Sequence, residues 1–284
     1  MTVCIAATAT ERLLSGKIPL IVTASDQMVG TGFSSADEAM VKLEPFHKDW
    51  SAMIAANDLS QYVPIIERAR ANFRGKPNTL LMARTAFKRA YQQHVSEKAV
   101  DEVLGRFGLD MDTFRKTGLR QFGESEFRAL CDDIKQVSAE CKFLVFGYDK
   151  DHTPHIFTVE NPGIDEVQDK PGYCAIGAGQ YAAEPVLTLF NQNEECTLRQ
   201  SIINVCCAKF MAERVPGVGK STHLFVKRQG YPMYGYVGMD IVKEIRKAWE
   251  LDGCPRVPTG ILERLQAVNI SFLTGEPNWD EESL

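Results

Sequence analysis

Three polar residues near the start of the chain are of types that nucleophilic chemistry uses. Thr2 supplies a hydroxyl, Asp26 ends the apolar stretch Ile-Val-Thr-Ala-Ser-Asp, and Lys42 follows sixteen residues later (42 − 26 = 16). A threonine hydroxyl is a weak nucleophile at neutral pH and needs a neighbouring base. Removal of Met1, which the small Thr2 side chain permits, would leave an α-amino group with a pKa of ~7.7–8.0 beside that hydroxyl. Each residue alone also fits a plain structural role, in a strand, a turn or an edge.

A glycine-rich segment at 215–222, Val-Pro-Gly-Val-Gly-Lys-Ser-Thr, is superficially similar to a phosphate-binding loop. That pattern requires a glycine five residues before Gly219, where Arg214 stands instead. A phosphate loop also follows a strand and opens a helix, whose N-terminus faces the phosphates. Here the expected order is reversed, with a helix before the segment and a strand after it. We therefore interpret 215–222 as a turn from helix into strand.

Cysteine and histidine side chains offer little metal or redox chemistry. The eight cysteines form no Cys-x-x-Cys pair and lie mostly in apolar stretches, which favours reduced, buried thiols. His152 and His155 flank a sequence, with Asp151 and Pro154, that is typical of a hairpin turn. We expect neither a metal site nor an organic cofactor.

Composition limits the class of protein further. The chain has 284 residues, of which 44% are hydrophobic and 24% charged, as in ordinary globular proteins. Its net charge of −5 argues against a broad nucleic-acid or anionic-membrane surface. No apolar run approaches the ~20 residues of a membrane helix, and the N-terminus lacks the basic stretch of a secretory signal. We expect a cytoplasmic protein without nucleic-acid or membrane partners.

The chain is expected to begin with strands alone. Residues 2–8 and 18–24 are short and rich in alanine and β-branched side chains, which predicts a hairpin. Two more strands are expected at 40–43 and 50–55. Helical spacing then begins at 62–73 and 80–91, with shorter helical pieces at 96–120 and another helix around 127–134. Strands are expected again at 142–147, 155–159, 173–176 and 223–227, and helices at 183–190, 198–210, 239–251 and 259–267.

Blocks of hairpins separated by pairs of helices predict the fold class. Regular alternation of strand and helix would indicate a parallel doubly wound sheet, and this chain lacks it. The order fits an α+β, four-layer αββα sandwich of two antiparallel sheets. We expect a single domain over 1–274, with an enlarged helical segment near 95–125 and an extension from about 230. The acidic residues 275–284 are expected to form a mobile tail.

With strands placed first, the group Thr2, Asp26 and Lys42 resembles the pattern of the β-type subunits of proteasomes. These are threonine peptidases of the N-terminal nucleophile (Ntn) hydrolase class. Segment 55–58, Ala-Ala-Asn-Asp, is similar to the turn that supplies the family's oxyanion-hole N–H, here that of Ala56. Segments 143–149 and 173–179 resemble later landmarks in the same order. The resemblance runs from Thr2 to about Gln229. The stretch between Thr2 and Asp26 is longer than is usual, and we place the extra residues in the first hairpin loop.

The resemblance assigns a role to each residue. Thr2 would be the nucleophile and its α-amine the base, acting through water. Lys42 would lower the cost of forming the alkoxide, and Asp26 would orient Lys42. Val29 and Ile54 are expected to line an apolar primary pocket.

Two departures from the family pattern concern activity. Ala178 stands where active members carry a serine in the late Gly-x-Gly turn, and Val218 replaces a second serine. Those groups help to position the threonine amine, so their loss would slow or silence catalysis. Ser221 and Glu213 are candidate substitutes.

The resemblance implies hydrolysis of peptide bonds in peptides or unfolded proteins, within a ring of identical subunits. Two alternatives share the fold. One is a non-catalytic subunit that builds a ring or binds partners, and the other is an amidase for a small molecule.

Overall fold

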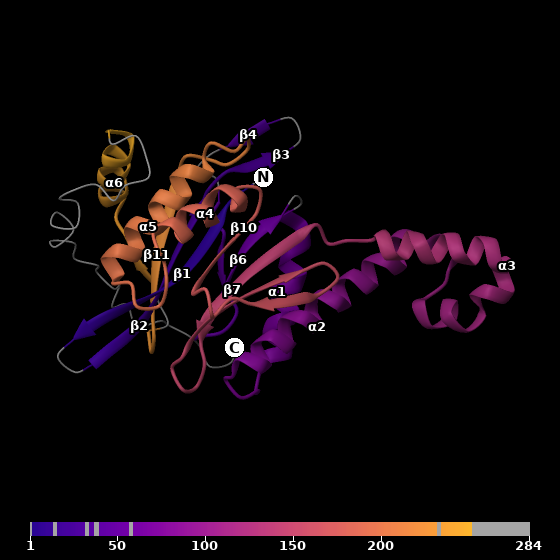
Figure 1. Cartoon of the computed structure of the whole chain (residues 1–284). Helices are drawn as coiled ribbons and strands as arrows, with labels where there is room; N and C mark the ends of the chain where they lie inside the picture. The colour runs from indigo at the N-terminus through magenta and orange to yellow at the C-terminus, as the bar shows by residue number, and fades with distance from the viewer. Residues whose placement is uncertain are drawn as a thin grey trace.

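The computed structural model describes residues 2–13, 16–31, 34–36, 40–56, 59–231 and 234–251. Two five-stranded antiparallel sheets lie face to face, and helices cover the outer face of each (Figure 1). Three sets of buried side chains fill the spaces between these layers. The predicted αββα sandwich is therefore confirmed.

The first sheet has the order β10-β1-β2-β11-β12. Along β1, the second strand in this order, successive side chains point to opposite faces of the sheet. Ile5 and Ala7 pack against helices, whereas Cys4 and Ala6 pack between the sheets. Both faces of β1 are buried, so the strand is apolar on both sides. The strands are β1 (Cys4–Leu13), β2 (Gly16–Asp26), β10 (Tyr173–Ile176), β11 (Thr222–Arg228) and β12 (Tyr234–Tyr236).

The hairpin of β1 and β2 corrects one expectation. Its pairing continues without a break from Cys4↔Ser25 to Leu13↔Gly16. The extra residues between Thr2 and Asp26 therefore lengthen the two strands, and do not form a long loop. An unbroken antiparallel ladder satisfies the backbone groups of those added residues, which a loop would leave to solvent.

The second sheet has the order β5-β6-β7-β8-β9. Trp50, Ala52 and Ile54 of β6 face the outer helices, while Met53 and Ala55 face the first sheet. A separate two-stranded ribbon, β3 with β4, was not predicted. The strands are β3 (Val29–Thr31), β4 (Ser34–Ala36), β5 (Leu43–Pro45), β6 (Trp50–Ala56), β7 (Cys141–Tyr148), β8 (Pro154–Glu160) and β9 (Ile164–Val167).

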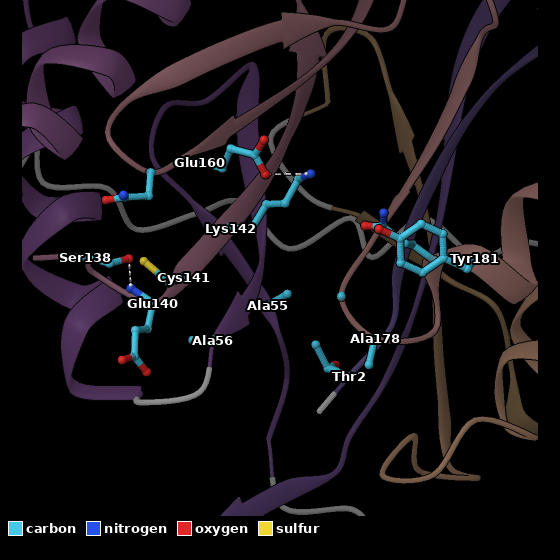
Figure 2. A pocket seen from close by; sticks show the side chains of 13 residues that line it. Thr2, Ala55, Ala56, Ser138, Glu140, Cys141, Lys142, Glu160, Ala178 and Tyr181 are labelled. Carbon is cyan, nitrogen blue, oxygen red and sulfur yellow. Dashed lines mark hydrogen bonds and ion pairs between the residues drawn. The ribbon is translucent and has the colours of Figure 1, made fainter. Parts of the chain in front are cut away.

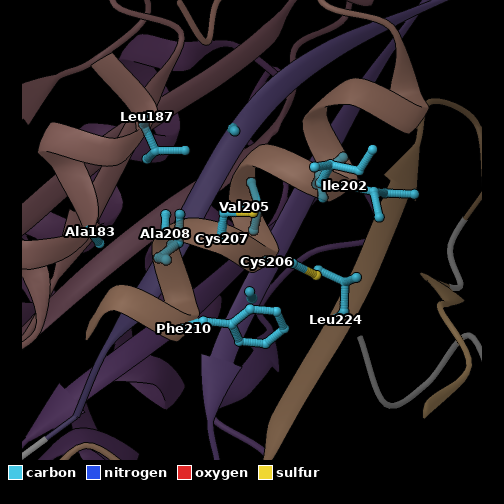
Figure 3. Packing of buried hydrophobic residues seen from close by; sticks show 14 of the residues in the cluster. Ala183, Leu187, Ile202, Val205, Cys206, Cys207, Ala208, Phe210 and Leu224 are labelled. Atoms are coloured by element: carbon cyan, nitrogen blue, oxygen red, sulfur yellow. The ribbon is translucent and has the colours of Figure 1, made fainter. Parts of the chain in front are cut away.

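The helices form two outer layers. On the first sheet, α5 is buried on nearly every side, and Figure 3 shows Val205, Cys206 and Phe210 of α5 packed with Leu187 of α4 and Leu224 of β11. On the second sheet, α1 and α2 supply the apolar cover. The helices are α1 (Tyr62–Phe73), α2 (Leu80–Ala99), α4 (Gln180–Leu189), α5 (Leu198–Ala212) and α6 (Met239–Leu251), and a short 3-10 turn, η1 (Leu59–Gln61), precedes α1.

A helical arm projects from the sandwich beyond the end of α2 (Figure 1). It comprises η2 (Val100–Leu104), η3 (Gly105–Phe107) and α3 (Met111–Gln136), and it has its own small apolar core that includes Leu104, Phe114 and Leu130. Gly123 has φ +73°, which breaks the regular helix within α3. The arm overlaps the region near 95–125 where an enlarged helical segment was expected, and residues 95–99 belong to α2.

Two expectations fall outside the described residues: the helix at 259–267 and the tail at 275–284. None of the helices in the described ranges is long and apolar enough to cross a membrane. Among the seven cysteines in those ranges there is no disulfide, and all but Cys131 are buried.

His155 lies at the predicted hairpin between β7 and β8, held between two carboxylates. Its Nδ1 lies 2.7 Å from Asp169 Oδ2, and its Nε2 lies 3.4 Å from Asp149 Oδ2. Burial alone would lower the pKa of His155, but the two carboxylates outweigh it and raise the pKa above the usual 6.5. The imidazolium form therefore stabilises this end of the sheet. Among the described residues, no three His, Cys, Asp or Glu side chains are grouped as a metal site.

We predict that His155→Gln destabilises the protein at pH 6 by ~1.5 kcal/mol, the scale of a hydrogen bond to a charged group, and by less at pH 9. A raised folded-state pKa gives stability that is fully present below the unfolded pKa of 6.5. That stability is lost as the pH rises through the folded pKa. Urea denaturation of both proteins at the two pH values measures the difference, and His152→Gln on the exposed turn is the control. An equal loss at pH 6 and pH 9 would contradict the charged pairing.

Candidate active site

The carboxylate of Asp26 is the centre of the predicted group. Its Oδ1 accepts hydrogen bonds from the hydroxyl of Thr2, from the backbone N–H of Val3 at 2.9 Å and from Lys42 Nζ at 2.9 Å. Asp26 is 0% exposed. A buried carboxylate is tolerated only when its lone pairs are satisfied, and here one oxygen alone has three donors. The structure thus brings the three predicted residues into direct contact.

The two sheets deliver these residues from opposite sides. Thr2 precedes β1 and Asp26 ends β2, and the ladder that joins the strands places them together, with Asp26 N donating to Val3 O at 3.3 Å. Lys42 instead precedes β5 of the second sheet, where its carbonyl accepts from Ile54 N at 3.2 Å. The predicted strand at 40–43 therefore begins later than expected, at Leu43. The ion pair of Lys42 with Asp26 joins one sheet to the other.

The Thr2 hydroxyl makes two hydrogen bonds in this cluster. It donates to Asp26 Oδ1 and accepts from Lys42 Nζ. An ammonium group that donates to a hydroxyl oxygen favours the build-up of negative charge on that oxygen. The arrangement can therefore stabilise an alkoxide at Thr2.

Thr2 also lines a cavity of about 490 Å³ (Figure 2). Ala55 and Ala56 at the end of β6 also line it, so the predicted oxyanion residue shares the cavity with Thr2. Lys142 and Glu160 form an ion pair of 2.8 Å across another part of the lining. The remaining lining residues are Ser138, Glu140, Cys141, Asn161, Gly177, Ala178, Gln180 and Tyr181.

This lining differs from the expected apolar pocket. Ile54 does not reach the cavity, because its side chain packs in the core beneath the outer helices. Even positions of β6 face those helices and odd positions face the first sheet, so Ala55 takes the place expected for Ile54. Val29 lies on β3, and its side chain is outside the described part of the structure.

The turn from β10 into α4 packs closely against Thr2. Gly177 has φ +88°, and a Cβ there would overlap the carbonyl oxygen of Thr2 and lie 2.9 Å from its Cγ2. Gly179 N donates to Thr2 O at 3.2 Å. Only glycine at 177 combines the left-handed conformation with this approach. Ala178 lies between them in the cavity lining and offers no hydroxyl to the site.

Neither candidate substitute for the missing serines contacts Thr2. Glu213 pairs with Lys209 and Arg246. Ser221 lines a different cavity, of about 560 Å³, between α5 and α6.

The segment 215–222 has a part in the site that its sequence did not reveal. It is a turn between α5 and β11, as predicted, and not a phosphate loop. Gly219 N, however, donates to Asp26 Oδ2 at 3.3 Å. A backbone contact of this kind carries no side-chain signal, and sequence patterns therefore could not indicate it.

Two cysteines close to the site are poor rivals for the hydroxyl. Burial raises the pKa of Cys4 to about 12 despite the nearby Lys42. Burial also raises the pKa of Cys141 in the cavity lining to about 12. Because the thiolate is the reactive form, both thiols are inert at neutral pH.

Comparison with known proteins bears on the fold alone. No family model matches the chain, and no curated protein matches it. Its structure is similar to one described as the Anbu (Gly-1) mutant from Hyphomicrobium sp. strain MC1. The TM-score is 0.59 at 13% sequence identity, and the match covers 95% of this chain and 98% of that one. Together with the two-sheet sandwich, this likeness shows that the chain shares the fold of that protein.

We predict that Gly177→Ala destabilises the protein by ~2–4 kcal/mol. The added methyl group would clash with Thr2, and alanine also adopts this positive φ unfavourably. Gly230→Ala is the matched control, since Gly230 has φ +73° with nothing within 4 Å of an added Cβ. Gly230→Ala should lower the free energy of unfolding by only ~1 kcal/mol, which is the cost of the left-handed backbone conformation alone. Urea denaturation measures both. Equal losses would show that the turn does not press on Thr2.

Proposed function

We propose that the protein is a threonine-type Ntn hydrolase that cleaves amide bonds in peptides or unfolded chains once Met1 is removed. One observation carries the proposal: the Thr2 hydroxyl is hydrogen-bonded to both Lys42 Nζ and Asp26 at the wall of a cavity. A hydroxyl, a cation and a carboxylate buried together give no more stability than apolar packing would. A role in function therefore explains this group better than a role in stability does.

The proposed chemistry assigns one task to each group. The free α-amine of Thr2, acting through a water molecule, takes the hydroxyl proton as Oγ1 attacks the substrate carbonyl carbon. Lys42 stabilises the developing charge on Oγ1, and Asp26 holds Lys42 and balances its charge. The product of this attack is an ester between Thr2 and the acyl group, and the amine leaves with the proton. Water then hydrolyses the ester by the same base.

Ala56 is proposed to stabilise the tetrahedral intermediate through its backbone N–H. It lies at the end of β6 on the cavity wall shared with Thr2. An oxyanion-hole donor of this kind contributes ~3–4 kcal/mol to the rate. The polar and charged side chains around the cavity, Glu140 and Gln180 among them, favour a polar substrate segment over an apolar one.

Two other functions have specific support. Ala178 gives the site no hydroxyl beside Thr2, which favours a non-catalytic subunit of the same fold. The cavity of about 490 Å³ is within the ~300–1,000 Å³ of small-ligand sites, which favours an amidase for small molecules. Turnover of peptides against turnover of short acyl amides separates these possibilities.

The first prediction from this mechanism concerns Met1. With Met1 attached, the nitrogen of Thr2 is an amide and cannot accept a proton. Because a general base contributes ~10²–10⁴ in rate, the unprocessed protein should be slower by about that factor. Thr2→Ser should keep part of the activity, whereas Thr2→Ala should have none. Intact mass identifies each form, and fluorogenic peptides measure turnover.

The control for that experiment is Thr8→Ala, a buried threonine of β1 that lies away from the cavity and donates to Gly172 O at 2.9 Å. It reports what loss of a buried hydroxyl does to stability alone. Equal turnover by processed and unprocessed protein, or turnover by Thr2→Ala, would overturn the threonine mechanism.

We also propose that copies of this chain assemble into a ring. Exposed apolar side chains on three different helices, Leu81, Leu119 and Leu189, support this assembly. Sedimentation at several micromolar concentrations should show a species several times heavier than the 31.7 kDa chain. A single 31.7 kDa species throughout the series would contradict the ring.

A further inference from the structure

The second oxygen of the Asp26 carboxylate depends on the loop after α5. Asp26 Oδ2 accepts from the backbone N–H of Met28 at 3.2 Å and of Gly219 at 3.3 Å. Met28 is only two residues away in the chain, so its bond is local. Gly219 is 193 residues away, and its position is set by tertiary structure. The orientation of the carboxylate therefore depends on what holds the Gly219 loop.

Two cations from two helices hold that loop by its carbonyl groups. Lys209 Nζ, from α5, donates to the carbonyl oxygen of Gly219 at 2.8 Å. Arg246 Nη2, from α6, donates to the carbonyl oxygen of Lys220 at 2.9 Å. Consecutive carbonyl groups are thus fixed immediately after the N–H that binds Asp26.

Glu213 links the two cations into one network. Its Oε1 accepts from Lys209 Nζ, and its two carboxylate oxygens accept from Arg246 Nη2 at 2.7 Å and Nη1 at 2.6 Å. A bidentate arginine–carboxylate pair fixes direction as well as distance. The Arg246 guanidinium also lies over the Phe210 ring, 4.1 Å from its centroid. The network is therefore geometrically rigid.

Stability alone does not explain why a lysine is buried at position 209. Its side chain is 0% exposed, and Ala208 and Phe210 on either side of it in the chain pack in the apolar core (Figure 3). An apolar residue at such a position commonly gives equal or greater stability than a buried ion pair. Glu213 offsets one of the two cations. The negative charge of Asp26, which is itself paired with Lys42, also acts on Lys209 from across the loop.

We infer that Lys209, Glu213 and Arg246 are positioning residues that hold Gly219 against Asp26 and, through Asp26, orient the Thr2 hydroxyl. None of the three lines the cavity beside Thr2. Their effect on catalysis rests on the proposed function, whereas their effect on the loop and on Asp26 does not. The inference also gives α6, in the chain's C-terminal extension, a direct connection to the site.

Arg246→Leu is the most informative variant. It removes the hydrogen bonds to Lys220 O and Glu213 while leaving Glu213 paired with Lys209. Removal of Glu213 would instead leave Lys209 buried without its carboxylate. Lys247→Leu is the matched control, because it makes the same charge change at the next, exposed position of α6. Arg246→Lys keeps the charge and tests partial rescue.

The first measurement is independent of turnover. In Arg246→Leu, hydrogen exchange measured by NMR should be about tenfold faster at the amides of Gly219 and Val3. Both of these amides donate to Asp26. Exchange should be unchanged in Lys247→Leu and intermediate in Arg246→Lys. If Arg246→Leu does not fold, the comparison of Arg246→Lys with Lys247→Leu decides. Exchange equal to that of the control at both amides would overturn the inference.

The second measurement is the kinetics of the processed protein on a fluorogenic peptide. Arg246→Leu should lower kcat on the order of 10²-fold, the scale of a misplaced reacting group, with KM unchanged because no cavity residue is altered. A rise in KM with constant kcat would contradict a positioning role. If the wild-type protein cleaves no peptide while exchange responds as predicted, the proposed function fails and the positioning network stands.

Discussion

A single buried carboxylate joins the separate parts of this molecule. Asp26 ends a strand of the first sheet, and the cation that neutralises it, Lys42, enters from the second sheet. Because an unpaired charge in that position would cost several kcal/mol, the two sheets must meet in one register at this end of the sandwich. Thr2, just before β1, and the loop at Gly219 then close around the same group. The position of every other element of the site follows from satisfying this one group.

That constraint also explains why the cavity lies where it does. Strand ends leave the sheet, so their side chains are free to converge, whereas side chains within the sheets are committed to packing. Ala55 and Ala56 close one wall at the end of β6, and the Gly177 turn closes another against Thr2. Small residues at these places let the backbone approach the hydroxyl. A larger side chain at either place would occupy the space in front of the Thr2 hydroxyl.

The sequence predicted the layers and the central group better than the surroundings of the site. Apolar alternation and helical spacing are local signals, so most strands and helices were found, while the short β3, β9 and β12 carry too few residues to show a period. Thr2, Asp26 and Lys42 could be grouped because their types and spacing are visible in the chain, and the structure brings them into contact. Ile54 was misplaced by one position, which in a strand reverses the face. Gly219 could not be found, because its contribution is a backbone N–H.

Backbone donors such as the N–H of Gly219 explain how a site with few hydroxyl side chains can keep its geometry. The family pattern that this chain resembles carries serines where Ala178 and Val218 stand here, so the chain has fewer hydroxyl groups than that pattern. The backbone nevertheless donates to Asp26 from Val3, Met28 and Gly219. Backbone donors must be held by something else, and the buried charges of α5 and α6 do this from outside the cavity. Under the proposed function, orientation of the Thr2 hydroxyl therefore depends on an ion-pair network behind the cavity, and a search for activity should examine those residues as well as the cavity lining.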